Sequence, residues 1–157
     1  MDINDIPCEI YHDSIIELLQ EGKVVEVRAR GGSMLPYLCG NGNEILIVSP
    51  CSPSDLQRGE LVIFGRKKLI CHRIIKRDGN NLTIQGDGII RKKEQVEVTD
   101  VKGIVRKIIK PNGKTVSTQT PAVQRYWRIW LRLPATVKWF IIFPYRVKAK
   151  LYRILKQ

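Results

Sequence analysis

Three short segments of the chain carry side chains that could together perform nucleophilic chemistry. Ser33 follows two glycines in GGSMLPYL, His72 lies in the apolar run ICHRII, and Asp87 stands between two glycines in QGDG. A serine becomes a nucleophile when a base removes its proton, and a neutral imidazole is the usual base near neutral pH. A carboxylate can then hold the imidazole and stabilise its charged form. Each residue alone is more typical of a turn or a core position, but together they form a candidate catalytic set.

The backbone around the serine suits stabilisation of an oxyanion. Glycine lets a substrate approach closely, and the N–H groups of Gly32 and Ser33 could point at a developing negative charge. Candidate residues for a substrate pocket or its rim are Val27, Met34, Leu35 and Tyr37. Met34 and Leu35 are equally suited to a hydrophobic core.

The segments between these motifs predict a mainly antiparallel β fold. Helical spacing of apolar residues predicts a short helix at 13–20. Short apolar or alternating runs predict strands at 23–30, 44–48, 60–64, 69–75, 81–85, 96–98 and 102–109. Turn residues separate these runs, and Asp78-Gly79 between two of them is a strong hairpin signal. Many short strands joined by turns are typical of an antiparallel sheet.

Length and charge place the chain in a broad class. Its 157 residues match one ordinary domain, which excludes a multi-domain enzyme. The formal net charge is +12, and all 15 Asp and Glu residues fall within the first 100 residues. The basic character therefore belongs to the C-terminal part. The cysteines show no CxxC spacing and the two histidines offer no paired ligands, so we expect no metal and no cofactor.

The C-terminal part, residues 121–157, forms a tail of different composition after the polar linker KTVSTQTP. It contains all three tryptophans and nine Lys or Arg residues. Its longest uncharged run, 139–145, is far shorter than the roughly 20 apolar residues that a membrane-spanning helix needs. We expect a basic amphipathic helical tail that contacts a membrane surface. The expected contact residues are Trp127, Arg128, Trp130, Arg132, Trp139 and Phe140.

Two alternatives for the tail remain open. It could pack on the domain with its cations solvated, or it could contact nucleic acid through phosphates. Nucleic acid is disfavoured because the tail carries no recognised nucleic-acid motif.

The N-terminal run MDINDIPCEIYHD is acidic and lacks an apolar segment, so we expect no secretory signal peptide. The expected location is the cytoplasm, peripherally at the inner face of the membrane.

The order of the motifs resembles the signal peptidase I and S24/S26 serine peptidase superfamily. GGSMLPYL, RGELVIF, ICHRII and LTIQGDG follow one another over roughly residues 25–110, about half the chain. In that family a Ser-Met-x-Pro motif carries the nucleophile, and the base lies on a later strand beside an arginine. The resemblance implies a signal-peptidase-like domain over residues 1–120, with a β core at about 23–110. It also implies a serine endopeptidase that removes a leader- or signal-type segment from a peptide or pre-protein.

Position 72 distinguishes the branches of this superfamily. Bacterial-type signal peptidases use a lysine there, whereas the archaeal and endoplasmic-reticulum type uses a histidine. The resemblance therefore implies that Ser33 is the nucleophile, His72 the base and Asp87 the acid of the Gly-Asp motif. Lys67 and Lys68 lie nearby but outside the matching position. We expect them to be solvated charges, with a lysine base as the alternative.

Departures from the family pattern support a different class of function. Asn41 or Asn43 stands where the family usually has an acidic residue, and Lys93 lies where the histidine branch often has a second aspartate. These residues favour a catalytically silent β-domain that binds a peptide or a membrane surface. A third hypothesis, a repressor-type regulator, is disfavoured because about 22 residues precede the first predicted strand, too few for a helix-turn-helix domain.

Overall fold

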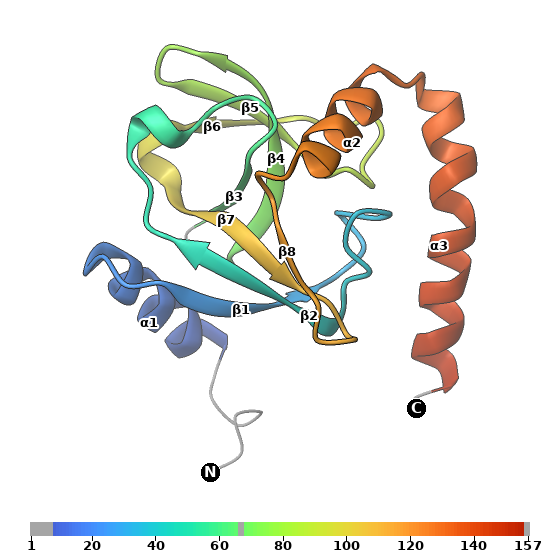
Figure 1. Ribbon diagram of the computed structural model, residues 1–157, viewed down its shortest axis with the longest axis horizontal. Helices are drawn as coiled ribbons and strands as arrows, with labels where there is room; N and C mark the ends of the chain where they lie inside the picture. Colours follow the sequence, from blue (N-terminus) through green and yellow to red (C-terminus); the bar gives the residue numbers. More distant parts are fainter. Residues whose placement is uncertain (1–7, 66–67, 156–157) are drawn as a thin grey trace.

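The computed structural model describes residues 8–65 and 68–155, which form one antiparallel sheet and three α-helices (Figure 1). The strands are β1 (Val25–Arg30), β2 (Asn41–Ser49), β3 (Leu61–Phe64), β4 (Ile70–Asp78), β5 (Asn81–Gln85), β6 (Glu94–Glu97), β7 (Val101–Ile109) and β8 (Thr115–Ser117). Their order in the sheet is β1-β2-β7-β3-β4-β5-β6, with β8 paired to β7. Every pair is antiparallel, which confirms the predicted mainly β fold.

The helices are α1 (Cys8–Gln20), α2 (Pro121–Arg132) and α3 (Ala135–Leu155), and short 3-10 helices lie at Pro53–Asp55 and Val98–Asp100. The N-terminal helix begins earlier than its predicted start at residue 13. It buries Ile15 and Leu19 against the sheet. It ends where Gly22 adopts a φ of 80° and the N–H of Lys23 donates to the carbonyl of Leu18, a common helix C-terminus that favours glycine.

Strand β3 passes between two hydrophobic clusters. Leu61 and Ile63 belong to the cluster that includes α1, β1 and β2, whereas Val62 and Phe64 belong to the cluster that includes β4, β5 and β6. Successive side chains of a strand point to opposite faces, so a strand that is buried throughout needs apolar residues on both faces. In the adjacent strand β4, the segment from His72 to Ile74 is buried as well.

The predicted polar linker before the tail is part of the sheet. Its residues Thr115–Ser117 form β8, in which Val116 pairs with Ile108 of β7. Thr118 is buried and its hydroxyl donates to the carbonyl of Val105. Thr120 then caps α2 by accepting a hydrogen bond from Val123. The prediction of a linker was wrong because a three-residue strand is too short to show an alternating pattern.

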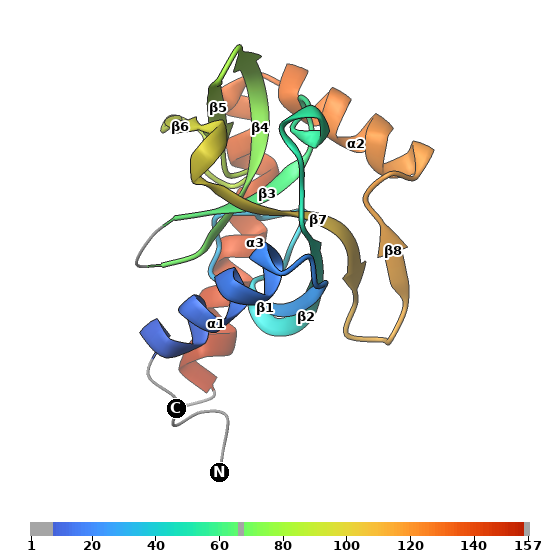
Figure 2. The ribbon, with the colours of Figure 1, turned by 90° about the vertical axis from the view of Figure 1, so that its left-hand side faces the viewer.

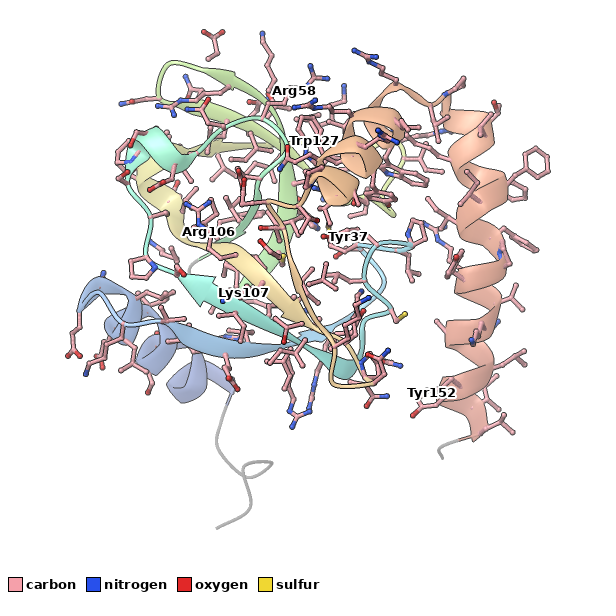
Figure 3. All side chains as sticks on the ribbon, viewed as in Figure 1. Tyr37, Arg58, Arg106, Lys107, Trp127 and Tyr152 are labelled. Carbon is pink, nitrogen blue, oxygen red and sulfur yellow. The ribbon has the colours of Figure 1, made fainter. Side chains whose placement is uncertain are left out.

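Helix α2 packs on the sheet, and α3 stands at one side of the molecule. Trp127 reaches from α2 to Gly59, where an added Cβ would lie 2.3 Å from the indole (Figure 3). Ile142 of α3 is buried together with Leu35 and Trp130. Helices α1 and α3 lie on opposite sides of the sheet (Figures 1 and 2). None of the helices described has both the length and the apolar character that crossing a membrane requires.

Candidate active site

The loop between β1 and β2 carries Ser33, three residues after the end of β1. The N–H of Gly31 donates to the carbonyl of Gly40 at 2.8 Å and closes the base of the loop. Met34 and Leu38 are buried in the larger hydrophobic cluster and anchor its middle. Ser33 itself is half-buried. The loop therefore has a fixed path, and its serine lies at the boundary between interior and solvent.

A buried carboxylate holds the far end of the same loop. Glu44 is 1% exposed, and its Oε2 accepts from the backbone N–H of Cys39 at 2.6 Å. Its Oε1 accepts from Lys110 Nζ at 2.7 Å. Lys110 also donates to the carbonyl of Tyr37. A paired buried charge that is fully hydrogen-bonded keeps its geometry, so these contacts restrict the position of the loop that carries the serine.

A second loop, which follows β5, packs closely against the serine loop. The N–H of Gly88 donates to the carbonyl of Ser33 at 2.8 Å. A Cβ added at Gly88 would lie 2.6 Å from the carbonyl oxygen of Gly32, and one added at Gly86 would lie 2.3 Å from that of Ser33. No larger residue fits at either position without displacement of backbone. The two glycines of the QGDG motif are therefore required for the contact between the loops.

The ring of His72 and the carbonyl of Ser33 lie toward the same side of Gly86. The point where a Gly86 Cβ would stand is also 3.1 Å from His72 Nε2. The fold thus brings the serine segment and the imidazole together, as the sequence predicts for a catalytic pair. The His72 side chain is 4% exposed, and its Nε2 has no hydrogen-bond partner in the part of the chain that the structure describes. The hydroxyl of Ser33 forms no hydrogen bond with it there.

The acid nearest the imidazole is Glu94, which the sequence analysis did not select. Glu94 Oε1 lies 3.2 Å from His72 Nδ1, within ion-pair distance but without the alignment of a hydrogen bond. The β4–β5 and β5–β6 registers, in which Arg73 pairs with Gln85 and Ile84 with Glu94, set the two side chains near each other. The available signal was that Glu94 is the first acid after the QGDG motif.

The environment of the imidazole favours its neutral form. Burial is the largest influence and lowers the pKa of His72, while the negative charges of Glu94 and Asp87 oppose this change and Lys92 adds to it. Desolvation disfavours the charged form of a buried histidine. A neutral ring with an unpartnered Nε2 is the form that can accept a proton.

Asp87 does not take the position expected of the acid that holds the imidazole. Its Oδ1 accepts from Arg73 Nε at 2.9 Å and its Oδ2 from Arg73 Nη2 at 2.7 Å, with both side chains buried. Arg73 donates a further hydrogen bond to the carbonyl of Gly59. Both carboxylate oxygens are engaged by the guanidinium, so Asp87 joins β4 to the loop after β5 and makes no hydrogen bond with His72 in the described residues.

The four residues proposed for a substrate pocket lie mainly in the interior. Met34 and Leu35 are each 3% exposed and belong to hydrophobic clusters, which corrects the pocket assignment. Val27 is half-buried and packs against the core. The ring of Tyr37 lies inside, 5.0 Å from the Arg73 guanidinium (Figure 3), and burial raises the pKa of its hydroxyl to about 12. Met34, Leu35 and Tyr37 therefore anchor the serine loop in the interior.

Of the two lysines near the histidine strand, only Lys68 lies within the described residues. Lys68 is exposed, which agrees with the prediction of a solvated charge. Lys67 lies outside the described residues. The base that the structure places beside the serine segment is His72.

The tail residues divide between the interior and the surface. Trp127 and Trp130 are only 8% and 4% exposed, which corrects their assignment to a membrane contact. They belong to the side of α2 that packs on the sheet, and Trp130 Nε1 donates to the carbonyl of Asp87 at 3.2 Å. The remaining members of that predicted set are exposed, namely Arg128, Arg132, Trp139 and Phe140.

Comparison of the chain with family models, with curated proteins and with solved structures gave no match. The resemblance to signal peptidases therefore stays a prediction from the motifs.

Proposed function

We propose that this protein is a serine endopeptidase of the signal peptidase I-like kind. In this proposal Ser33 is the nucleophile and His72 the general base. The observation that carries it is the position of Gly86, whose lack of a side chain leaves the Ser33 backbone and the His72 ring as neighbours. The buried, unpartnered Nε2 adds support, because an unsatisfied polar atom in the interior is costly and such atoms cluster at functional sites.

The proposed reaction has two stages. Ser33 Oγ attacks the scissile carbonyl while its proton passes to His72 Nε2, and the N–H groups of Ser33 and Gly32 stabilise the tetrahedral oxyanion. The imidazolium then returns the proton to the leaving amine, and water hydrolyses the acyl-enzyme by the same route. Glu94 stabilises the imidazolium in place of Asp87. Catalytic hydrogen bonds are often long without substrate, so the missing Ser33–His72 bond should form when substrate is bound.

The proposed substrate is an extended leader- or signal-type segment of a peptide or pre-protein. Strand β1 leads directly into the serine loop and is at the end of the sheet order, paired with β2. An extended peptide can add to such an edge through main-chain hydrogen bonds. This would place the scissile bond beside Ser33.

A catalytically silent binding domain is the second candidate. It is favoured by the 3% exposure of His72 and by the absence of a hydrogen bond between the ring and Ser33 in the described residues. In that case the same β1 edge would hold a peptide without cleaving it.

Labelling with a fluorophosphonate probe distinguishes the two candidates. The wild-type chain should be labelled at one residue, and Ser33→Ala should lose the label. Ser117→Ala is the matched control, because Ser117 is also half-buried but lies on β8. Label that persists in Ser33→Ala would remove Ser33 as the nucleophile, and an unlabelled wild type would favour the silent domain.

A further inference from the structure

Helix α3 faces the domain with few of its side chains. Ile142 is 1% exposed and packs on Leu35 and Trp130. One turn further, Arg146 Nη2 donates to the carbonyl of Gly88 at 2.7 Å. These contacts define the inner side of α3. They also join the helix to the two loops of the candidate active site.

The opposite side of α3 is apolar and exposed. An α-helix turns about 100° per residue, so residues spaced by three and four share one side. We call the residues on this side the outer stripe, and they are Phe140, Phe143, Val147, Leu151 and Ile154. Their exposed fractions lie between 42% and 72%. Among the described residues, no other helix or strand lies beyond this side of α3 (Figure 1). An amphipathic helix normally turns its apolar stripe toward the core, and α3 does the reverse.

We propose that the outer stripe docks on a membrane surface that contains anionic lipid. The tail from residue 121 onward has nine Lys or Arg residues and no Asp or Glu. Lys148 and Lys150 are exposed on α3, and Arg128 and Arg132 on α2. Apolar side chains would enter the boundary of the acyl chains while these cations meet lipid phosphates, as in interfacial helices.

Charge and aromatic content favour lipid over a second copy of the chain. Two copies joined through their stripes would bring two basic helices together without an acid on either one. Trp139 is 48% exposed and lies beside the stripe, with its ring 5.3 Å from that of Phe140 and 5.2 Å from that of Phe143. Trp and Tyr rings prefer the headgroup level of a bilayer.

Vesicle flotation of the full chain tests this proposal. Vesicles of phosphatidylcholine with phosphatidylglycerol should carry the protein, while vesicles of phosphatidylcholine alone should carry much less. High salt should reduce binding, because it screens the cations. The double variant Phe140→Gln with Leu151→Gln should lower the apparent affinity by about tenfold or more, since each residue loses buried apolar area. Val24→Gln is the control, because Val24 is 59% exposed but lies outside the tail.

Circular dichroism and tryptophan fluorescence distinguish loss of membrane binding from loss of folding. Circular dichroism should show that the double variant keeps its helix content. Emission from Trp139 should shift to shorter wavelength on binding, since the other two tryptophans are already buried. Failure of the wild type to float, or equal binding by the double variant, would overturn the proposal. A concentration-dependent dimer that dissociates in the double variant, without vesicle binding, would assign the stripe to a second copy instead.

Discussion

The guanidinium of Arg73 holds both carboxylate oxygens of Asp87 in the interior of the protein, at 2.9 and 2.7 Å. Arg73 follows His72 on β4, and Asp87 follows Gly86 in the loop after β5. The ion pair therefore sets the spacing between the strand that carries the imidazole and the loop that contacts the serine. Its role is to hold the site together, and it leaves Glu94 as the acid beside His72.

Asp87→Asn should destabilise the fold strongly. The change leaves the buried charge of Arg73 without its partner, and breaking a buried pair in this way costs roughly 3–5 kcal/mol. Chemical denaturation followed by circular dichroism measures the free energy of unfolding. Asp78→Asn is the control, because the Asp78 side chain is 84% exposed. If Asp87→Asn keeps full stability but loses activity, Asp87 acts in catalysis and not in holding the fold.

The pH dependence of peptide cleavage should report the environment of His72. Its acid limb in kcat/KM should lie below about 6.5, the ordinary imidazole value, because burial lowers the pKa of His72. Glu94→Gln removes a negative charge that raises this pKa, so the limb should move to still lower pH and the maximal rate should fall. Glu97→Gln, an exposed change on the same strand, should leave both unchanged. If the acid limb of kcat/KM stays at the same pH in Glu94→Gln, the charge of Glu94 does not influence the pKa of His72.

The same lowered pKa should make stability depend on pH. The unfolded chain binds a proton at His72 below about pH 6.5, whereas the folded chain resists it until lower pH. The free energy of unfolding should therefore decrease as the pH falls through this value. His72→Gln should show a shallower decrease over the same range, measured by urea denaturation at a series of pH values. Identical slopes in the two proteins would show that His72 protonates equally in both states.

Gly86→Ala should abolish activity and lower stability. The added Cβ would meet the Ser33 carbonyl oxygen at 2.3 Å and the His72 ring at 3.1 Å, so the two loops must separate. Gly79→Ala is the comparison, because its Cβ would meet nothing within 4 Å and its cost of roughly 1 kcal/mol comes from its positive φ alone. Thermal unfolding and probe labelling of both variants measure the difference. Equal losses in the two would show that the contact at Gly86 is not needed.

Ile142→Ala should loosen α3 while the sheet keeps its stability. Ile142 is the side chain through which α3 enters the cluster with Leu35 and Trp130, and truncation of a buried isoleucine leaves a cavity. Hydrogen exchange should become faster in α3 and remain unchanged in β3 and β7. Phe140→Ala is the control on the same helix, because Phe140 is 72% exposed and faces away from the domain. Similar exchange rates in the two variants would contradict docking through Ile142.

Most of the sheet could be predicted because its strands have local signals. Val25, Val27 and Ala29 alternate with charged residues and form β1, and the turn at Asp78-Gly79 joins β4 to β5 as expected. Strand β8 was missed because its three residues carry no periodic signal. The burial of Trp127 and Trp130 was also missed, since a basic and aromatic helix has the same composition whether its rings face lipid or a sheet.

The sequence by itself determined the strand-rich fold, the segregation of positive charge into the tail, and Ser33 and His72 as candidate reactive groups. These depend on residue type and on spacing over a few positions. Only the tertiary structure decided that Asp87 pairs with Arg73, that Glu94 stands beside the imidazole, and that the outer stripe of α3 faces away from the domain. Those relationships arise from the register of paired strands and from the packing of a helix on the domain. Residue spacing over a few positions predicts neither the register nor the packing.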